Sequence, residues 1–266
     1  MKNTQLKTIA LQTTKITAEV GDYIRAQIGK VASAQIETKS INSLVSHVDK
    51  TAEEMLVKQL GELIPGSVFI TEEETIEQAK GEFQWIIDPL DGTTNFLHGL
   101  PVFSISVALR QNEETILGVV LEINRNECFY AWKGGGAFLN EEKIQVSNCQ
   151  KLEDSLIATG FPYYDFEREE AYFKVFRYFI KNTRGIRRLG SAAVDLAYVA
   201  CGRFEGYFEY SSNAWDVAAG AFIVQEAGGQ VCDFSGGTNY LFGREIIATS
   251  GAFHEDFVEI ISPLKL

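Results

Sequence analysis

Residues 85–96 read Trp85-Ile86-Ile87-Asp88-Pro89-Leu90-Asp91-Gly92-Thr93-Thr94-Asn95-Phe96, an apolar run that stops at two aspartates three residues apart. The three consecutive apolar residues predict the end of a buried strand. Asp88 precedes a proline, which favours an extended backbone at Asp88. We therefore expect the strand to carry Asp88 at its tip and Asp91 in the loop just beyond.

The chemistry of this loop indicates a phosphate site. Two carboxylates on one short, kinked loop suit an oxygen-preferring cation such as Mg²⁺. Gly92 allows a backbone to approach a ligand closely, and Thr93 and Thr94 offer amides and hydroxyls to an anion. Asn95 is expected to begin a helix. The alternative is an ordinary turn, because Asp, Pro and Gly are common in turns for reasons unrelated to catalysis.

Size and charge restrict the class of protein. The 266 residues, 45% of them hydrophobic, suffice for one large domain or two smaller ones with a shared interface. The formal net charge of −12 argues against nucleic acid as the main partner. An anionic substrate would then need bound divalent cations to offset the negative charge locally.

The chain offers few signals for other chemistries. The four cysteines are widely spaced, which favours buried thiols in a reducing cytoplasm over disulfides or a zinc cluster. The three histidines are scattered, and His98 is expected to pack or cap rather than to catalyse. The first residues lack the apolar stretch of a signal peptide, and no run approaches the roughly 18 apolar residues of a membrane helix. We expect a cytoplasmic protein without a membrane partner.

Periodicity predicts an α+β first half and an α/β second half. Helices are expected at about 4–29 and from Asp49 to Pro65, with a short strand at 68–70. Strands at 103–109, 116–122 and 127–132 suggest an antiparallel sheet. The glycines at 134–136 predict a tight turn. Later segments alternate: strands at 155–159 and 207–210, and helices at 167–182, 191–201 and 214–227. We expect halves at 1–148 and 149–266, with the main metal loop in the first and the active site between them.

Further acidic residues have both structural and chemical interpretations. Glu72 and Glu73 follow the strand at 68–70, where an acidic run is often solvated surface. Asp216 falls in the first turn of a predicted helix, where a carboxylate is stabilising whatever its function. Asp49 lies where a helix N-cap is expected.

Two segments resemble the signatures of the inositol monophosphatase family, which belongs with fructose-1,6-bisphosphatase to a sugar-phosphatase superfamily. One is the stretch 85–96, and the other is Trp215-Asp216-Val217-Ala218-Ala219-Gly220. The resemblance extends from Lys39, which is similar to a family lysine near the site, to Gly229. It implies a layered α-β-α-β-α fold, a homodimer, hydrolysis of phosphate monoesters with two or three Mg²⁺ ions per site, and inhibition by lithium.

The same resemblance implies roles for individual residues. Asp88 would bridge two metals, Glu72 and the Leu90 carbonyl would hold the first, and Asp91 and Asp216 would hold the second. Glu72 and Thr93 would position the attacking water, with Asp49 hydrogen-bonded to the loop threonine. The implied substrate-binding residues are Gly92, Thr93, Thr94, Ser191, Ala192, Ala193 and Glu209. The chain departs from the family pattern at Thr71, where glycine is usual, and at Val48, where threonine is frequent.

The substrate that the resemblance favours is inositol 1-phosphate. Nucleotide 3′-phosphatases often have Lys-Glu in place of Thr94-Asn95, and Glu209 falls where the family has a glutamate that binds inositol or sugar hydroxyls. Alternatives are a 3′-phosphoadenosine 5′-phosphate phosphatase, a fructose-1,6-bisphosphatase-like enzyme, or a regulatory binding protein on the same fold.

Overall fold

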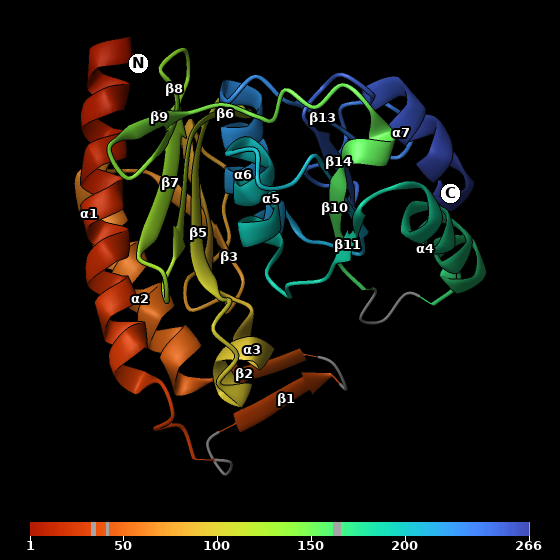
Figure 1. Ribbon diagram of the computed structural model, residues 1–266. Helices are drawn as coiled ribbons and strands as arrows, with labels where there is room; N and C mark the ends of the chain where they lie inside the picture. Colours follow the sequence, from red (N-terminus) through yellow and green to blue (C-terminus); the bar gives the residue numbers. More distant parts are fainter. Residues whose placement is uncertain (33–35, 41–42, 162–165, 266) are drawn as a thin grey trace.

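The computed structural model describes residues 1–32, 36–40, 43–161 and 166–265 as five stacked layers (Figure 1). Helices α1 (Asn3–Gln27) and α2 (His47–Leu63) cover one face of a first sheet. Helices α5 (Ala192–Ala200) and α6 (Ala214–Glu226) separate this sheet from a second one. Helices α4 (Glu169–Asn182) and α7 (His254–Ile261) cover the far side. The predicted α-β-α-β-α layering is confirmed.

The first sheet has seven strands in chain order, each paired with the next. They are β3 (Val68–Thr71), β4 (Phe83–Asp91), β5 (Ser104–Gln111), β6 (Glu114–Glu122), β7 (Glu127–Trp132), β8 (Gly136–Leu139) and β9 (Glu142–Ile144). All pairs are antiparallel except β3 with β4, which run parallel. The antiparallel sheet expected for the strands at 103–109, 116–122 and 127–132 is confirmed, and β3 adds a parallel strand at its edge. The parallel pairing brings the carboxyl ends of β3 and β4 to the same edge.

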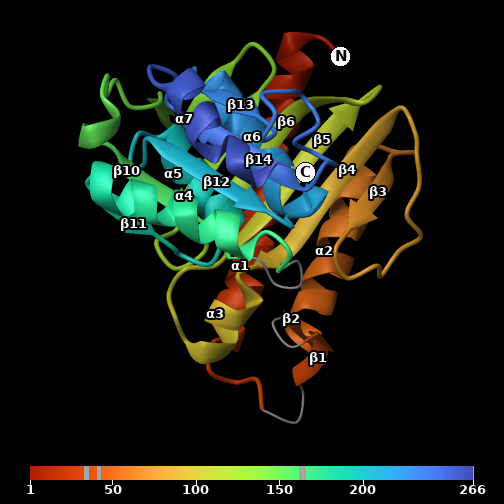
Figure 2. The same ribbon diagram turned by 90° about the vertical axis from the view of Figure 1, so that its right-hand side faces the viewer.

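The second sheet is mixed, in the order β11-β10-β12-β14-β13. Its strands are β10 (Leu156–Thr159), β11 (Gly185–Arg187), β12 (Gly206–Tyr210), β13 (Gln230–Cys232) and β14 (Glu245–Thr249). Short 3₁₀ helices span Leu152–Asp154 and Ser262–Leu264. The hairpin of β1 (Ile36–Ser40) and β2 (Ser43–Ser46) extends from the layers beside α3 (Thr93–His98), as Figure 2 shows. The boundary expected between residues 148 and 149 falls between the last strand of the first sheet and the first strand of the second, and the two-half division stays a prediction.

Alternation along the strands builds the core between layers. In β4, Trp85 and Ile87 pack in the cluster under α1 and α2, whereas Ile86 faces the cluster around α5 and α6. In β12, Tyr207 joins the central cluster and Phe208 the cluster under α4 and α7. This period of two is the reason that each sheet can be covered on both faces.

Close packing of α6 on the first sheet depends on a glycine. A Cβ at Gly118 of β6 would lie 2.7 Å from the Ala219 carbonyl oxygen. The small residues of α6 and this glycine together bring the helix against the sheet. The start of α6, with Asp216, is thereby fixed relative to β4.

Several local predictions change in the structure. The short helix after residue 92 begins at Thr93, not Asn95, with Gly92 as N-cap at φ +94°. Asp49 is in the first turn of α2 rather than at its N-cap, which is Ser46. The four described cysteines are free, and of these only Cys232 is buried.

None of the helices in the described residues is long and apolar enough to span a membrane.

Candidate active site

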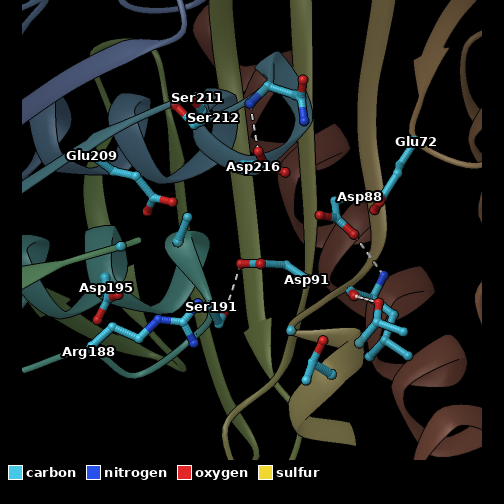
Figure 3. Close-up of a pocket in the computed structure, with 18 of the residues that line it drawn as sticks. Glu72, Asp88, Asp91, Arg188, Ser191, Asp195, Glu209, Ser211, Ser212 and Asp216 are labelled. Carbon is cyan, nitrogen blue, oxygen red and sulfur yellow. Dashed lines mark hydrogen bonds between the residues drawn. The ribbon is translucent and has the colours of Figure 1, made fainter. Parts of the chain in front are cut away.

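A cavity of about 350 Å³ opens between the end of β4 and the starts of α5 and α6. Acidic side chains from several elements point into it, as Figure 3 shows. Its described lining residues are Leu44, Glu72, Asp88, Leu90, Asp91, Gly92, Thr93, Thr94, His98, Gly160, Arg188, Gly190, Ser191, Ala192, Asp195, Glu209, Ser211, Ser212, Asn213 and Asp216. The cavity thus gathers residues from both halves of the chain.

Asp88 and Asp91 face it because β4 is irregular at this point. Asp88 pairs with Ser106 and Asp91 with Ser104, with a register shift between them at Pro89 and Leu90. A bulge of this kind bends a strand and redirects its side chains. The Leu90 amide donates to Asp88 Oδ1 at 2.9 Å, which fixes the carboxylate across the bend. The strand therefore carries both aspartates, rather than ending at Asp88 with Asp91 in the following loop.

Asp91 is held by the start of α5, one hundred residues later in the chain. Its Oδ2 accepts hydrogen bonds from Ser191 Oγ at 2.7 Å and the Ala193 amide at 2.8 Å. Ser191 and Ala192 line the cavity, whereas Ala193 is fully buried and, among the described residues, does not. In this structure Ser191 and Ala193 orient Asp91, and their role as substrate ligands stays a prediction.

Asp216 and Glu72 complete the group of four carboxylates. Asp216 lies in the first turn of α6, where its Oδ2 accepts from the Asn213 amide at 2.6 Å. Glu72 directly follows β3, and its amide donates to the Ile87 carbonyl of β4 at 3.3 Å. Both side chains are directed toward Asp88 in Figure 3.

Burial and mutual repulsion raise the pKa values of these acids. Burial raises the pKa of Asp88 well above its usual value, and the charges of Glu72, Asp91 and Asp216 raise it further. The pKa of Asp216 is raised by burial and then by Asp91 and Glu72. Burial raises the pKa of Asp91 to about 6, although the hydrogen bonds from Ser191 and Ala193 oppose the rise. A cluster in which each acid disfavours ionisation of the next is electrostatically suited to cations.

The donor set fits Mg²⁺. Four carboxylates and the Leu90 carbonyl are hard oxygen ligands of the kind Mg²⁺ prefers. Among the described residues lining the cavity, Arg188 is the only lysine or arginine. Within the described chain, no three acidic, histidine or cysteine side chains already stand at the spacing of a single metal site. The fit therefore rests on the chemistry and convergence of these oxygens.

Thr93 and Asp49 form a separate polar pair beside the acids. Thr93 Oγ1 lies 2.9 Å from both Asp49 Oδ1 and the Leu90 carbonyl oxygen. Asp49 is buried, and its Oδ2 accepts from the Ser46 amide and hydroxyl at 2.9 and 2.7 Å. The single hydroxyl proton of Thr93 can be donated to either of these two oxygens, so the Thr93 oxygen can still accept a hydrogen bond from a third group.

Glu209 lies on the opposite wall, in β12. Its carboxylate accepts a hydrogen bond from the Tyr207 hydroxyl and packs where a Cβ at Gly160 would fall, 1.9 Å from its carboxyl carbon. Burial raises the pKa of Glu209 to about 7, against the lowering effect of Tyr207 and Arg188. Figure 3 shows Glu209 above Arg188 and Asp195 on the same side of the cavity.

Sequence reasoning missed Arg188 and Asp195. Both line the cavity, and burial raises the pKa of Asp195 well above its usual value. The available signals were a basic pair before Gly190-Ser191 and a single acid inside an otherwise apolar helix. Thr94 and His98 line the cavity as exposed residues, and His98 is the last residue of α3. Lys39 belongs to β1, and its side chain lies outside what the structure describes.

Known proteins of one family match this chain over nearly its whole length. The model of the "Inositol monophosphatase family" matches residues 5–265. A protein of Pasteurella multocida named "Nus factor SuhB" is 42% identical over 246 residues, 92% of each chain. A Thermotoga maritima "Fructose-1,6-bisphosphatase/inositol-1-monophosphatase" is 40% identical over 248 residues, 93% of each chain. The crystal structure of the extragenic suppressor protein suhB from Bartonella henselae superposes with a TM-score of 0.88 at 36% identity, covering 93% of this chain and 96% of that one.

Proposed function

The chain belongs to the inositol monophosphatase family, and from this premise we propose that it is a Mg²⁺-dependent phosphate monoesterase acting on inositol 1-phosphate. The observation that carries the proposal is the convergence of Glu72, Asp88, Asp91 and Asp216 on one cavity, with the pKa of Asp88 raised by burial and by the other three. A deep acidic cavity is a poor site for a phosphate by itself. Its natural occupant is a phosphate together with divalent cations.

In this proposal the metal ligands are Glu72, Asp88, the Leu90 carbonyl, Asp91 and Asp216. Bound Mg²⁺ would supply activation of the attacking water and stabilisation of charge on the phosphate and the leaving oxygen. The Ser191 and Ala193 hydrogen bonds keep Asp91 oriented toward the cavity. Such second-layer contacts matter because ligands that are already oriented lose less entropy when an ion binds.

The chain's own groups would position the water and the phosphate. Thr93 gives its proton to Asp49 or to the Leu90 carbonyl, so its oxygen can accept a hydrogen bond from the attacking water. Glu72 would accept the second proton of that water. The first amides of α3, at Gly92 to Thr94, have no partner within the helix and can donate to phosphate oxygens.

The wall opposite the acids would receive the polyol. Glu209 and Arg188 offer an acceptor and a donor to hydroxyl groups. The pKa of about 7 at Glu209 would allow it to bind a hydroxyl in either protonation state. A substrate with several hydroxyl groups satisfies this wall better than an apolar ester does, which supports an inositol or sugar phosphate.

The direct test is phosphate release from inositol 1-phosphate, 3′-phosphoadenosine 5′-phosphate and fructose 1,6-bisphosphate, with Mg²⁺ or with EDTA. Mg²⁺-dependent preference for inositol phosphate supports the proposal in full. Preference for another substrate keeps the reaction and changes the substrate. Absence of turnover in a protein that binds Mg²⁺ would overturn it.

A regulatory binding role is the second candidate, because the Pasteurella multocida relative is named a Nus factor. The two candidates make different demands on Asp88. Catalysis requires its carboxylate, whereas a docking role for the outer surface does not. Capture of transcription proteins equally well by the wild type and by Asp88→Asn would support a second role, and capture by neither would argue against it.

A further inference from the structure

We propose that Glu53 is a positioning residue that holds the Glu72 loop in the geometry needed for metal binding. The inference rests on the proposed function, since it concerns how one of the proposed ligands is oriented. Glu53 does not line the cavity in the described residues, so it acts through the loop and not on substrate.

The side-chain hydrogen bonds of Glu53 in the described part of the chain go to the segment that follows Glu72. Its Oε2 accepts from the Glu73 amide at 2.7 Å. Its Oε1 accepts from the Thr75 amide at 2.8 Å and from Thr75 Oγ1 at 2.7 Å. The side chain is fully buried. A buried carboxylate is costly unless it is hydrogen-bonded, and here the loop supplies the donors.

The loop needs such an anchor. Three glutamates stand in succession at 72–74, and their charges oppose a compact arrangement. Glu74 has φ +52°, in the left-handed region that non-glycine residues adopt at an energetic cost. Glu53 binds the residues on both sides of Glu74, so its two oxygens span this left-handed residue. The segment before Glu72 is held independently by the pairing of β3 with β4.

Helix α2 supplies two buried carboxylates, Asp49 and Glu53, and each accepts hydrogen bonds from a different segment of the proposed site. Glu53 lies one helical turn after Asp49, so both carboxylates are on the same face of α2. Asp49 holds the Thr93 hydroxyl, and Glu53 holds the Glu72 loop. One helix therefore aligns two segments of the site, at Glu72 and at Thr93, that are separate in the chain. No feature of the two family-like motifs indicates this role.

The carboxylate is specifically required because it accepts at both oxygens. Glutamine in the same position presents one oxygen and one amino group. If its oxygen serves Thr75, its amino group faces the Glu73 amide, and two donors then oppose each other. Glu53→Gln keeps the size of the side chain but releases the loop next to Glu72.

The experiment measures Mg²⁺ binding directly by isothermal titration calorimetry, and Mg²⁺-dependent turnover in parallel. The variants are Glu53→Gln and Thr75→Val, which removes only the hydroxyl donor of an exposed residue. The matched control is Glu226→Gln. Glu226 lies at the end of α6 and accepts from the amides of Gly134 and Gly136 at 3.0 Å each, in a turn that carries none of the proposed ligands.

We expect Glu53→Gln to weaken Mg²⁺ binding by ~10–100-fold, the usual effect of removing an outer partner of a metal site. Turnover at saturating Mg²⁺ should change far less than the Mg²⁺ half-saturation concentration. Thr75→Val should weaken binding in the same direction by roughly 2–10-fold, because it removes one of the three donors to Glu53 and leaves the two amides. Glu226→Gln should leave binding unchanged.

Unchanged Mg²⁺ binding by Glu53→Gln would overturn the inference, as would equal weakening by Glu226→Gln, which would indicate general loosening. If Glu53→Gln does not fold, the Mg²⁺ affinity of Thr75→Val tests the inference, and an affinity equal to that of the wild type would overturn it. Failure of the wild type to bind Mg²⁺ would instead overturn the proposed function.

Discussion

Replacing Asp88 by asparagine should change stability and metal binding in opposite directions. Asp88 is buried, and the charges of Glu72, Asp91 and Asp216 raise its pKa. Asp88→Asn removes one charge from this group while keeping an oxygen that can accept from the Leu90 amide. The bend in β4 should therefore persist, and the metal-free protein should become more stable.

The size of each effect follows from the electrostatics. Relief of this repulsion at pH 8 should stabilise the metal-free variant by on the order of 1–3 kcal/mol, the usual size of the effect of a single buried substitution. For a chain of this length that gain would raise the unfolding temperature by roughly 2–10 °C. Loss of a carboxylate in contact with two proposed metals should lower kcat/KM by at least ~10³-fold, about 4 kcal/mol in transition-state stabilisation.

Two assays on the same preparation test the reasoning. Thermal unfolding in EDTA measures the stability of the metal-free protein, and phosphate release over a Mg²⁺ titration measures turnover. A variant that unfolds at a lower temperature in EDTA would show that the repulsion is not a dominant cost. Retention of Mg²⁺-dependent turnover near the wild-type level would refute the assignment of Asp88 as a metal ligand.

Three further predictions concern positioning, titration and packing. Asp49→Asn leaves the Thr93 or Ser46 donors without a full acceptor, so turnover should fall ~10–100-fold and stability by about 1 kcal/mol, measured by kinetics and thermal unfolding. Burial raises the pKa of Glu209 from 4.5 to about 7. As pH rises, Glu209 therefore loses its proton at a lower pH in the unfolded state than in the folded state. The free energy of unfolding of the metal-free protein should then fall as pH rises from about 4.5 to 7. Glu209→Gln should remove at most ~3 kcal/mol of that fall, and identical urea curves for both proteins at pH 5 and pH 8 would contradict the claim. Gly118→Ala would place a Cβ 2.7 Å from the Ala219 carbonyl, so urea unfolding should report a loss of roughly 1–3 kcal/mol, and no loss would mean that α6 can shift freely.

The local sequence determined much of the layered architecture. The predicted helices at 167–182, 191–201 and 214–227 overlap α4, α5 and α6, because their apolar spacing and glycine stops are properties of neighbouring residues. The family was also evident from two short segments, and the match over residues 5–265 confirms it. Short or polar elements such as the β1–β2 hairpin were missed, since too few residues alternate there to give a signal.

Only the tertiary structure decided which distant groups meet. Nothing near Asp91 in the sequence indicates that Ser191 and Ala193 hold its carboxylate, or that Glu53 holds the loop after Glu72. Periodicity reports which face of an element is buried but not which element covers it. The raised pKa values arise in the same way, because burial and the approach of like charges exist only once both sheets are stacked around α5 and α6. The sequence alone could therefore name the proposed ligands, whereas their mutual repulsion and the contacts that orient them are properties of the assembled fold.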